Sequence, residues 1–348
     1  MPTVLRVGIV GTGFGERVHV PGFAAHERFE VVAIASPTSA PGVAKRRKIP
    51  HAFRSTAEML AGVELDVLAV TSPPFDHAPS VLAGLERGLH ILCEKPFALD
   101  VAQGEAMLVA SERAGTVCAV AHEFRFTPQR QAIVELIRNR HLGPLRGIEV
   151  TQSSNKQRAS VERENDWYYD RARGGGIIGA NLSHLVDQAN WYAGRPPVRV
   201  TGFSRTADVE RVDANGPFST DVADGAYAYL DYGDGLIATT WVDATRAVEG
   251  ATVAVHGELR TVVATGANQV DLTTFTVDDD ETAELELVPQ KRANLAAAHR
   301  NLPAFAAMLD AFAAAIDGHG YGDLATFRDG LETQKILDLV ARGEPLRA

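Results

Sequence analysis

A glycine-rich turn near the start of the chain constrains the fold more than any other feature of the sequence. Gly11-Thr12-Gly13-Phe14-Gly15 follows an apolar run at Leu5–Val10 and opens a helical pattern. The first glycine permits a tight turn, the second lets the backbone approach a pyrophosphate, and the free amides of the following helix attract an anion. The turn therefore predicts a dinucleotide-binding βαβ unit. A purely structural turn is the alternative, because the third glycine comes one residue early and position 16 holds Glu16.

The first 122 residues alternate short apolar runs with helical patterns. The runs are Leu5–Val10, Val31–Ala35, Val67–Thr71, His90–Cys93 and Val117–Ala121. Near-continuous apolar runs of this length are typical of parallel strands that helices cover on both faces. Ser55-Thr56-Ala57-Glu58 is a capping box, and Asp100 is placed to cap a helix over Val101–Ala114 that ends at Gly115. We predict an α/β Rossmann domain over residues 1–122.

Beyond residue 122, strand-like runs dominate after a helical pattern at Gln129–Arg140. The runs are Gly147–Ser153, Val198–Ser204, Ala226–Leu230, Leu236–Val242, Val253–Val255, Thr261–Val263 and Leu285–Val288. Gly233-Asp234-Gly235 indicates a hairpin, and helical patterns at Leu302–Ile316 and Phe327–Ala341 close the chain. Successive strands with few helices between them predict a large, mostly antiparallel open sheet. We assign residues 123–348 to an α+β substrate-binding and oligomerisation domain, whose terminal helices can pack back on the first domain.

Composition excludes several classes of partner. The chain has 348 residues, which suits two domains, and its formal net charge of −10 disfavours nucleic acid, whose binding depends on clustered positive charge. No apolar run approaches the roughly 18–20 residues that span a bilayer, and no signal peptide pattern is seen. The two cysteines, Cys93 and Cys118, lie in apolar runs and are expected to be buried free thiols. We expect a cytoplasmic protein with no metal site, no nucleic-acid partner and no membrane partner.

The end of the second predicted strand bears on the choice of cofactor. An acidic residue there binds the ribose 2′-hydroxyl of NAD and repels a 2′-phosphate. The segment Ser36-Pro37-Thr38-Ser39 has no such residue. Ser36, Thr38 and Ser39 can donate hydrogen bonds to a phosphate, with Lys45 or Arg46 nearby, which favours NADP over NAD. The alternative is that the basic run Lys45–Lys48 is only a solvated helix face.

Two further segments carry groups suited to proton transfer. Glu94-Lys95-Pro96 follows a predicted strand at the edge of the sheet where open α/β sheets bind ligands. Burial or a neighbouring cation lowers the pKa of a lysine in such a place from about 10.4. Gly174–Asp187 is a glycine run that leads into a helix carrying His184. Taken alone, His184 is more often a structural histidine than a catalytic one.

The glycine turn, Ser72-Pro73-Pro74-Phe75-Asp76-His77, Glu94-Lys95-Pro96 and Gly174–Asp187 together resemble the glucose–fructose oxidoreductase/inositol dehydrogenase/MocA family. Ala121–Pro128 is similar to that family's crossover into the second domain. The likeness extends from residue 5 to the Phe327–Ala341 helix. It implies that Lys95 lies beside the nicotinamide ribose and assists proton transfer, and that His184 acts on the substrate oxygen as an acid or a base.

The resemblance also implies a set of binding residues. The cofactor residues are Gly11, Thr12, Gly13, Phe14, Gly15, Ser36, Thr38, Ser72, Pro73, His77, Glu94, Lys95 and Trp167. Lys95, Arg125, Tyr168, Asn181 and His184 are the substrate-binding candidates. One departure affects the mechanism: family members commonly have Asp four residues before the histidine and Gly two residues before it, where this chain has Ala180 and Leu182.

Three functions follow from this interpretation. The first is reversible hydride transfer between NADP, or NAD, and a carbinol carbon of a sugar, cyclitol or related polyol, with the reactive ring held between Lys95 and His184. The second is a non-catalytic NAD(P)-binding sensor or regulator, which the missing aspartate at position 180 motivates. The third is an NAD-dependent glycoside-cleaving enzyme that oxidises its substrate transiently. The resemblance implies a homodimer or homotetramer formed through the large sheet.

Overall fold

The computed structural model describes residues 3–278 and 281–343 and divides into two compact units. The described residues of the first unit lie within Met1–Phe126 and Gln290–Leu331. Those of the second unit lie within Thr127–Pro289 and Glu332–Ala348. Each unit contains its own hydrophobic core, which buries the apolar faces of its own sheet.

The first unit is built on a seven-stranded sheet, and its parallel strands confirm the predicted Rossmann topology. The strands are β1 (Leu5–Val10), β2 (Phe29–Ala35), β3 (His51–Phe53), β4 (Val67–Val70), β5 (His90–Cys93), β6 (Cys118–Val120) and β17 (Ala325–Thr326). Their order is β17-β6-β5-β4-β1-β2-β3, and only β17 runs antiparallel to its neighbour. Strands β2 and β3 are added on one side of β1, and strands β4, β5 and β6 on the other. The strand order therefore reverses between β1 and β4, the position at which such folds bind nucleotides.

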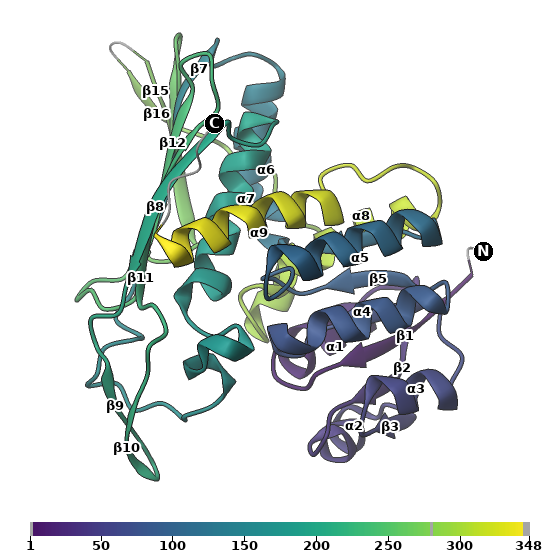
Figure 1. The fold of residues 1–348 in the computed structure, drawn as a ribbon. Coiled ribbons are helices and arrows are strands. Elements are labelled where there is room, and N and C mark those ends of the chain that lie inside the picture. Colours follow the sequence, from purple (N-terminus) through teal and green to yellow (C-terminus); the bar gives the residue numbers. More distant parts are fainter. Residues whose placement is uncertain (1–2, 279–280, 344–348) are drawn as a thin grey trace. The chain divides into compact units, whose positions relative to one another are not determined.

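Helices pack on both faces of this sheet, as the near-continuous apolar strands require. They are α1 (Val20–Ala24), α2 (Ala40–Arg47), α3 (Thr56–Gly62), α4 (His77–Glu86), α5 (Val101–Ala114), α8 (Leu302–Ile316) and the start of α9 (Phe327–Arg342). Val7 and Ile9 of β1 pack with α8 in one core cluster, whereas Val10 belongs to the cluster on the opposite face. Figure 1 shows α4 and α5 side by side along the sheet.

The predicted helix caps are present in this unit. The Ser55 hydroxyl accepts a hydrogen bond from the amide of Glu58, but the Glu58 carboxylate accepts from the amide of Arg54 rather than from that of Ser55. The Asp100 carboxylate accepts from the amide of Gln103 at 2.8 Å, and α5 ends at Gly115 with φ +66°. These caps satisfy backbone groups that the first and last helical turns leave without partners.

The second unit is built on an eight-stranded, mostly antiparallel sheet, as predicted. Its strands are β7 (Leu145–Ser153), β8 (Arg199–Arg205), β11 (Gly225–Asp231), β12 (Ile237–Asp243), β13 (Gly250–Gly257), β14 (Thr261–Gly266), β15 (Leu272–Val277) and β16 (Thr282–Glu284). The order is β16-β15-β14-β13-β7-β12-β11-β8, and β7 and β12 form the only parallel pair within this sheet. The predicted hairpin at Gly233–Gly235 joins β11 to β12, with positive φ at all three residues.

One face of this sheet packs against helices α6 (Pro128–Arg138), α7 (Ser183–Ala193) and the second half of α9 (Figure 1). Alternate residues of β11, such as Ala226, Ala228 and Leu230, are buried in this core. The residues between them, Tyr227 and Tyr229, lie on the opposite face. A separate hairpin, β9 (Glu210–Asp213) with β10 (Gly216–Ser219), stands outside the sheet.

Two features of the second unit differ from the sequence prediction. The predicted strand at Leu285–Val288 is wrong: the strand is Thr282–Glu284, and only the Leu285 amide continues the ladder by donating to the Thr274 carbonyl. Leu285 and Leu287 are only partly buried and Val288 is 84% exposed, so little apolar surface holds this segment on the sheet, and Pro289 cannot donate to a ladder. Strands β9 and β10 were not predicted, because Pro217 and the polar residues around it hide their alternation.

No helix in the described part of the chain is both long and apolar enough to cross a membrane. Within the same residues, no three His, Cys, Asp or Glu side chains gather as metal ligands. Cys93 and Cys118 are free and buried.

Candidate cofactor and catalytic site

The register of the parallel sheet brings the predicted motifs of the first unit to one edge. Val10 pairs with Val70, Val70 with Cys93, and Cys93 with Val120, so β1, β4, β5 and β6 end in one row. The ladder continues one residue further, because the amides of Thr71, Glu94 and Ala121 donate to the preceding row at 2.7–2.8 Å. The segments that follow, beginning at Gly11, Ser72, Lys95 and His122, therefore start side by side at the carboxyl edge of the sheet.

Each glycine of the first turn has its own structural reason to lack a side chain. Gly11 has φ +99°, and a Cβ there would lie 2.6 Å from both the Thr71 carbonyl oxygen and the Ser72 amide. A Cβ at Gly15 would collide with the Thr71 hydroxyl, which donates to the Val10 carbonyl at 2.7 Å. Gly13 has no neighbour within 4 Å of its Cβ position and is exposed. The outer two glycines therefore allow the turn to pack on β4, whereas Gly13 leaves space beside the loop.

The residues at this edge fit a dinucleotide. The Ser72 hydroxyl oxygen is buried, and no hydrogen-bond partner for it occurs within residues 3–278 and 281–343. A buried hydroxyl without a partner is unfavourable, so this atom is suited to meet a bound polar group. Open space at Gly13 and the start of a helical segment at Gly15–His19 provide room and free amides for a pyrophosphate. Gly11–Gly15 and Ser72 are the residues that would hold it.

Three hydroxyls gather where β2 ends, at the position expected for the adenosine ribose. The Ser39 hydroxyl lies 2.6 Å from that of Thr12 and 2.8 Å from that of Ser36. Ser39 precedes the first turn of α2, and Thr38 is exposed beside it. Two of the three predicted hydroxyl donors therefore lie together, and Thr12 of the glycine turn joins them.

Glu94 and Lys95 follow β5 at the same edge. The Glu94 carboxylate lies 2.8 Å from Nε2 of His19, and both side chains are buried. Burial raises the pKa of Glu94, but the hydrogen bond with His19 and the charges of His19, Lys95 and His77 together outweigh it and hold that pKa below its usual value. The Lys95 amide donates to the same carboxylate at 3.3 Å, and the Lys95 side chain is half-buried. The ionised Glu94 carboxylate therefore holds the backbone at the start of the segment that carries Lys95.

A second buried carboxyl group, Glu123, follows β6 in the same row. Asn301, just before α8, donates to its Oε1 atom at 2.9 Å. Burial, and then the negative charge of Glu94, raises the pKa of Glu123 to about 7. Two nearby carboxyl groups with pKa values displaced in opposite directions are typical of functional sites and of buried ionic networks alike. Neither Glu123 nor Asn301 was predicted to be functional from the sequence.

The other predicted residues of the first unit support the loops of this edge. The imidazole nitrogens of His77 lie 2.8 and 2.9 Å from the carbonyl oxygens of Ser72 and Pro96. Burial lowers the pKa of His77. Phe14 contacts His19 and His299 edge to face at 6.0 Å. Pro73 leads from Ser72 into a helical turn at Pro74–Asp76.

Arg125 is also in the first unit and is buried. Its Nη1 atom donates to the Asp323 carbonyl at 3.4 Å and lies 3.8 Å from the Asp329 carboxylate. These contacts tie the turn Glu123–Phe126 to the segment around β17.

In the second unit, the glycine run packs directly on the segment that precedes it. A Cβ at Gly175 would collide with the Tyr168 carbonyl oxygen, and the Gly176 amide donates to that oxygen at 2.9 Å. Gly176 has φ +95°, and the Ile177 amide donates to the Ala223 carbonyl. The run therefore brings Trp167 and Tyr168 to the start of the helix that carries His184, an arrangement that the sequence left open.

His184 lies in the first turn of α7 and is buried. A π-helical segment, Ile178–Leu182, leads into this helix and contains Ala180 and Asn181. The Asn181 amide donates to the Gln152 side chain on β7 at 3.2 Å. Trp167 and Tyr168 are half-buried in a turn that Asp166 caps. Burial raises the pKa of Tyr168, against the opposing charge of Arg163, whose guanidinium lies 5.2 Å from the ring.

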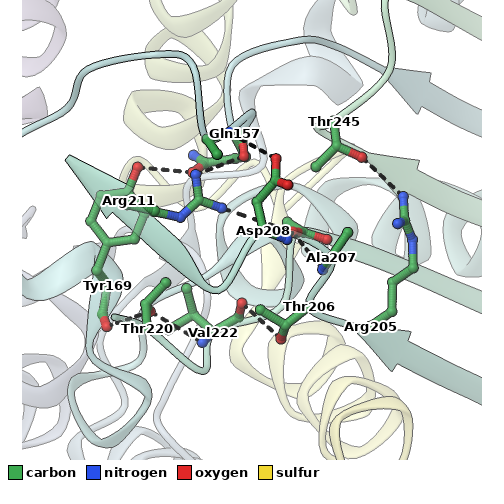
Figure 2. Close-up of polar contacts among 12 residues, drawn as sticks. Gln157, Tyr169, Arg205, Thr206, Ala207, Asp208, Arg211, Thr220, Val222 and Thr245 are labelled. Carbon is green, nitrogen blue, oxygen red and sulfur yellow. Dashed lines mark hydrogen bonds and ion pairs between the residues drawn. The ribbon is translucent and has the colours of Figure 1, made fainter. Parts of the chain in front are cut away.

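A buried polar network holds the segment 155–173 in place (Figure 2). Arg211 on β9 donates to the Gln157 carbonyl at 2.7 Å, and its guanidinium lies 5.1 Å from the centre of the Tyr169 ring. The Tyr169 hydroxyl donates to the Gln157 side chain at 3.0 Å, and the Tyr169 carbonyl accepts from the Thr220 hydroxyl at 2.8 Å. Arg211 of the β9–β10 hairpin and Thr220 directly after it therefore hold this segment at Gln157 and Tyr169, on either side of Trp167 and Tyr168.

Asp224 supplies the negative charge of this network. One carboxylate oxygen accepts hydrogen bonds from the amides of Ala207 and Asp208 at 2.8 and 2.9 Å, and lies 3.8 Å from Arg211. Both side chains of this pair are at least 97% buried. Asp224 follows Ala223, which accepts from Ile177 at the start of the His184 segment.

Comparison with known proteins decides the family. Residues 5–122 match the family described as oxidoreductases with an NAD-binding Rossmann fold, and residues 130–263 match its GFO/IDH/MocA C-terminal domain. The two matches together span more than half of the chain. The chain belongs to the GFO/IDH/MocA oxidoreductase family.

Several known proteins are similar to part of the chain. It is 32% identical over 60% of its length to an uncharacterised oxidoreductase of Synechocystis. It is 30% identical over 56% of its length to D-glucoside 3-dehydrogenase of Escherichia coli, and 32% over 55% to an NADP-dependent D-xylose 1-dehydrogenase of Haloferax volcanii. The aligned part covers only 56–58% of the length of each of these relatives.

Solved structures share the whole fold. The complex of levoglucosan dehydrogenase with NADH and L-sorbose aligns over 99% of this chain and 98% of its own, with a TM-score of 0.83 at 20% identity. An oxidoreductase domain protein from Kribbella flavida aligns over 99% of this chain and 97% of its own, with a TM-score of 0.84 at 19% identity. At this identity the likeness concerns the fold alone.

The motifs that resemble this family contain most of the predicted residues in the first unit, and the structure brings these together at one sheet edge. His19, Glu123 and Asn301 were missed because each is remote in sequence from the motif it supports. The position of Glu123, three residues after the end of the buried strand β6, gave a weak signal, since polar residues that follow a buried parallel strand lie near the ligand-binding edge. The assignments of Lys95 and His184 to catalysis remain predictions.

Proposed function

We propose that this GFO/IDH/MocA oxidoreductase is an NADP-preferring dehydrogenase that oxidises a carbinol carbon of a sugar, cyclitol or related polyol. The proposal rests on the carboxyl edge of the first sheet. There the buried Ser72 hydroxyl and the open space at Gly13 belong to neighbouring segments that follow β4 and β1, and Lys95 belongs to the next segment, which follows β5. The named relatives act on D-glucosides and D-xylose, which supports a polyol substrate class. The hydroxyls of Thr12, Ser36 and Ser39, with no acidic residue beside them on β2, favour NADP.

We assign the proton chemistry to Lys95 and His184. The nicotinamide, when bound, accepts or supplies the hydride. A hydroxyl group that is oxidised must lose its proton, and an imidazole or a lysine amine is suited to accept it near neutral pH. Glu94 holds the backbone of Lys95 through the Lys95 amide, and His19 keeps the Glu94 carboxylate ionised. Tyr168 and Asn181 are the proposed substrate-side residues of the second unit, with Arg125 as a further candidate. Trp167 is the proposed contact of the second unit with the cofactor.

A spectroscopic screen tests this function. The chain is incubated with NADP⁺ or NAD⁺ and a panel of aldoses, inositols and glycosides between neutral and alkaline pH, and nicotinamide reduction is followed by absorbance. We expect reduction with at least one polyol and a lower KM for NADP⁺ than for NAD⁺. Reduction with none of the panel, despite binding of the dinucleotide, would contradict the dehydrogenase assignment.

Ala180 favours one alternative, a dinucleotide-binding sensor or regulator without turnover. An aspartate one helical turn before the histidine would orient the imidazole, and an alanine methyl group cannot accept its hydrogen bond. This alternative predicts tight NADP binding without oxidation of any polyol. A glycoside-cleaving enzyme predicts a third outcome of the same screen, in which a glycoside is consumed without net reduction of the nicotinamide.

We also propose that two copies of the chain associate through the open face of the large sheet. Its strand register aligns Phe203, Tyr227 and Trp241 in one row across β8, β11 and β12. The Phe203 and Tyr227 rings stack at 4.9 Å, and Phe203 and Tyr229 are 57% and 45% exposed. Exposed aromatic side chains gathered on one face are typical of association surfaces. Light scattering at micromolar concentration is expected to give the mass of a dimer or tetramer.

A further inference from the structure

Glu16 occupies the position at which the dinucleotide motif usually has its third glycine. Its carboxylate accepts two hydrogen bonds from Arg46, from Nε at 3.1 Å and from Nη2 at 2.8 Å. Nε of Arg47 lies 3.4 Å from the same carboxylate. The carboxylate side chain is mostly buried, with 18% exposed, whereas Arg46 is 62% exposed. A residue that replaces a glycine of the binding motif thus engages two cations of the neighbouring helix.

The guanidinium of Arg46 lies over the first turn of α2, which follows the hydroxyl cluster at the end of β2. A Cβ at Gly42 would be 3.3 Å from Nη1 of Arg46, so the side chain folds back over the first turn of α2. That turn follows Ser39, whose hydroxyl contacts those of Thr12 and Ser36. The hydroxyls, the start of α2 and the guanidinium therefore lie along one short stretch of the first unit.

These groups have the chemistry of a phosphate site, except for Glu16. Hydroxyl groups donate to phosphate oxygens, and a guanidinium binds phosphate through two parallel hydrogen bonds. One bidentate edge of the Arg46 guanidinium, formed by Nε and Nη2, is occupied by the Glu16 carboxylate. The hydrogen bond from Arg46 is the main cause that lowers the pKa of Glu16, and burial opposes it, so the carboxylate is ionised at neutral pH. A 2′-phosphate must therefore compete with an anion that is already in place.

We propose that Glu16 limits the preference of this chain for NADP over NAD by competing with the 2′-phosphate for Arg46 and Arg47. The inference rests on the proposed dinucleotide function and concerns only the adenosine end of the ligand. Glu16 weakens binding of a 2′-phosphorylated nucleotide through charge repulsion and through its hold on Arg46. It leaves binding of the unphosphorylated nucleotide unchanged, because a 2′-hydroxyl makes no demand on the guanidinium.

Calorimetric titration with 2′,5′-ADP and 5′-AMP tests the proposal without any catalytic turnover. The proteins are the wild type, Glu16→Gln, Arg46→Met and the double variant, with Glu30→Gln as a control for net charge because Glu30 is exposed on β2. We expect Glu16→Gln to raise the affinity for 2′,5′-ADP about fivefold, a size suited to a partly exposed ion pair, and to change the affinity for 5′-AMP less than about twofold. Arg46→Met lowers the 2′,5′-ADP affinity, and the double variant shows a much smaller gain from Glu16→Gln.

The outcomes separate this inference from the proposed function. Equal changes for the two nucleotides, an unchanged or lowered 2′,5′-ADP affinity in Glu16→Gln, or the same gain in Glu30→Gln would overturn the role of Glu16 while the dinucleotide site stands. A full gain from Glu16→Gln in the Arg46→Met background would overturn the competition for Arg46. If neither nucleotide bound the wild type, the proposed function and this inference would both fail.

Discussion

Replacing Arg211 with methionine tests the network that holds the segment 155–173. The change removes a charged hydrogen bond to the buried Gln157 carbonyl, worth about 1.5–3 kcal/mol, and a buried cation–π contact with Tyr169, worth about 2 kcal/mol. It also leaves Asp224 buried without its cation, although two backbone amides still donate to that carboxylate. These contributions lower the free energy of unfolding of the second unit by about 3–5 kcal/mol, the usual cost of breaking a buried ion pair.

Tryptophan fluorescence during urea unfolding measures this loss specifically. All three tryptophans, Trp167, Trp191 and Trp241, lie in the second unit, so the signal reports on that unit alone. With a slope of about 2 kcal/mol per molar urea, the midpoint falls by about 1.5–2.5 M. The control is Arg199→Met on β8, where the arginine is exposed and the change is expected to alter stability by less than about 0.5 kcal/mol.

Kinetics of the Arg211→Met variant separate the anchoring role from a general loss of fold. Release of the segment carrying Trp167 and Tyr168 is expected to raise the KM for the polyol at least several-fold, while the dissociation constant for NADP⁺ stays within about twofold. A midpoint shift below about 0.3 M would refute the energetic argument. An equal loss of polyol and NADP⁺ affinity would refute the role of the network in placing the segment.

Four further predictions concern other groups. Lys95→Ala is expected to reduce polyol turnover about 100-fold or more while NADP⁺ affinity stays within a few-fold, measured by steady-state kinetics and by titration. Ser72→Ala is expected to weaken NADP⁺ binding about fivefold without lowering the melting temperature, because the hydroxyl has no partner to lose within the described residues. The pKa of Glu123, raised by burial to about 7, means that the folded state holds a proton that the unfolded chain releases near pH 4.5, so stability is lost as pH rises from 4.5 to 7. Glu123→Gln removes this loss, and its advantage in melting temperature over the wild type, followed by circular dichroism, should be larger at pH 8 than at pH 5. Phe203→Asp is expected to shift the mass in light scattering toward the monomer, because it places a charge in the aromatic row of the open sheet face.

Most of what the sequence predicted correctly about the first unit depends on residues that are near one another in the chain. The buried parallel strands have a continuous apolar pattern, and their carboxyl ends coincide with Gly11, Ser72 and Lys95, so topology alone placed these motifs together. The helix caps at Ser55 and Asp100 were also predictable, because a cap depends on contacts within three residues.

Contacts between remote residues could not be predicted in the same way. Glu16 pairs with Arg46 on another helix, 30 residues away in the sequence. The basic run Lys45–Lys48, which resembled a solvated helix face, therefore takes part in an ionic cluster through Arg46. Glu123 meets Asn301 across 178 residues, so no local pattern marks the pair. The β9–β10 hairpin is short and polar, and its stability depends on Arg211 contacts rather than on an alternating apolar face.

Hydrogen–deuterium exchange with and without saturating NADP⁺ tests most directly whether the carboxyl edge of the first sheet binds a dinucleotide. The account predicts slower exchange in peptides that contain Gly11–Gly15, Ser36–Ser39, Ser72–His77 and Glu94–Pro96. Exchange at these four segments that is unchanged by NADP⁺ at a concentration where calorimetry records binding would contradict it.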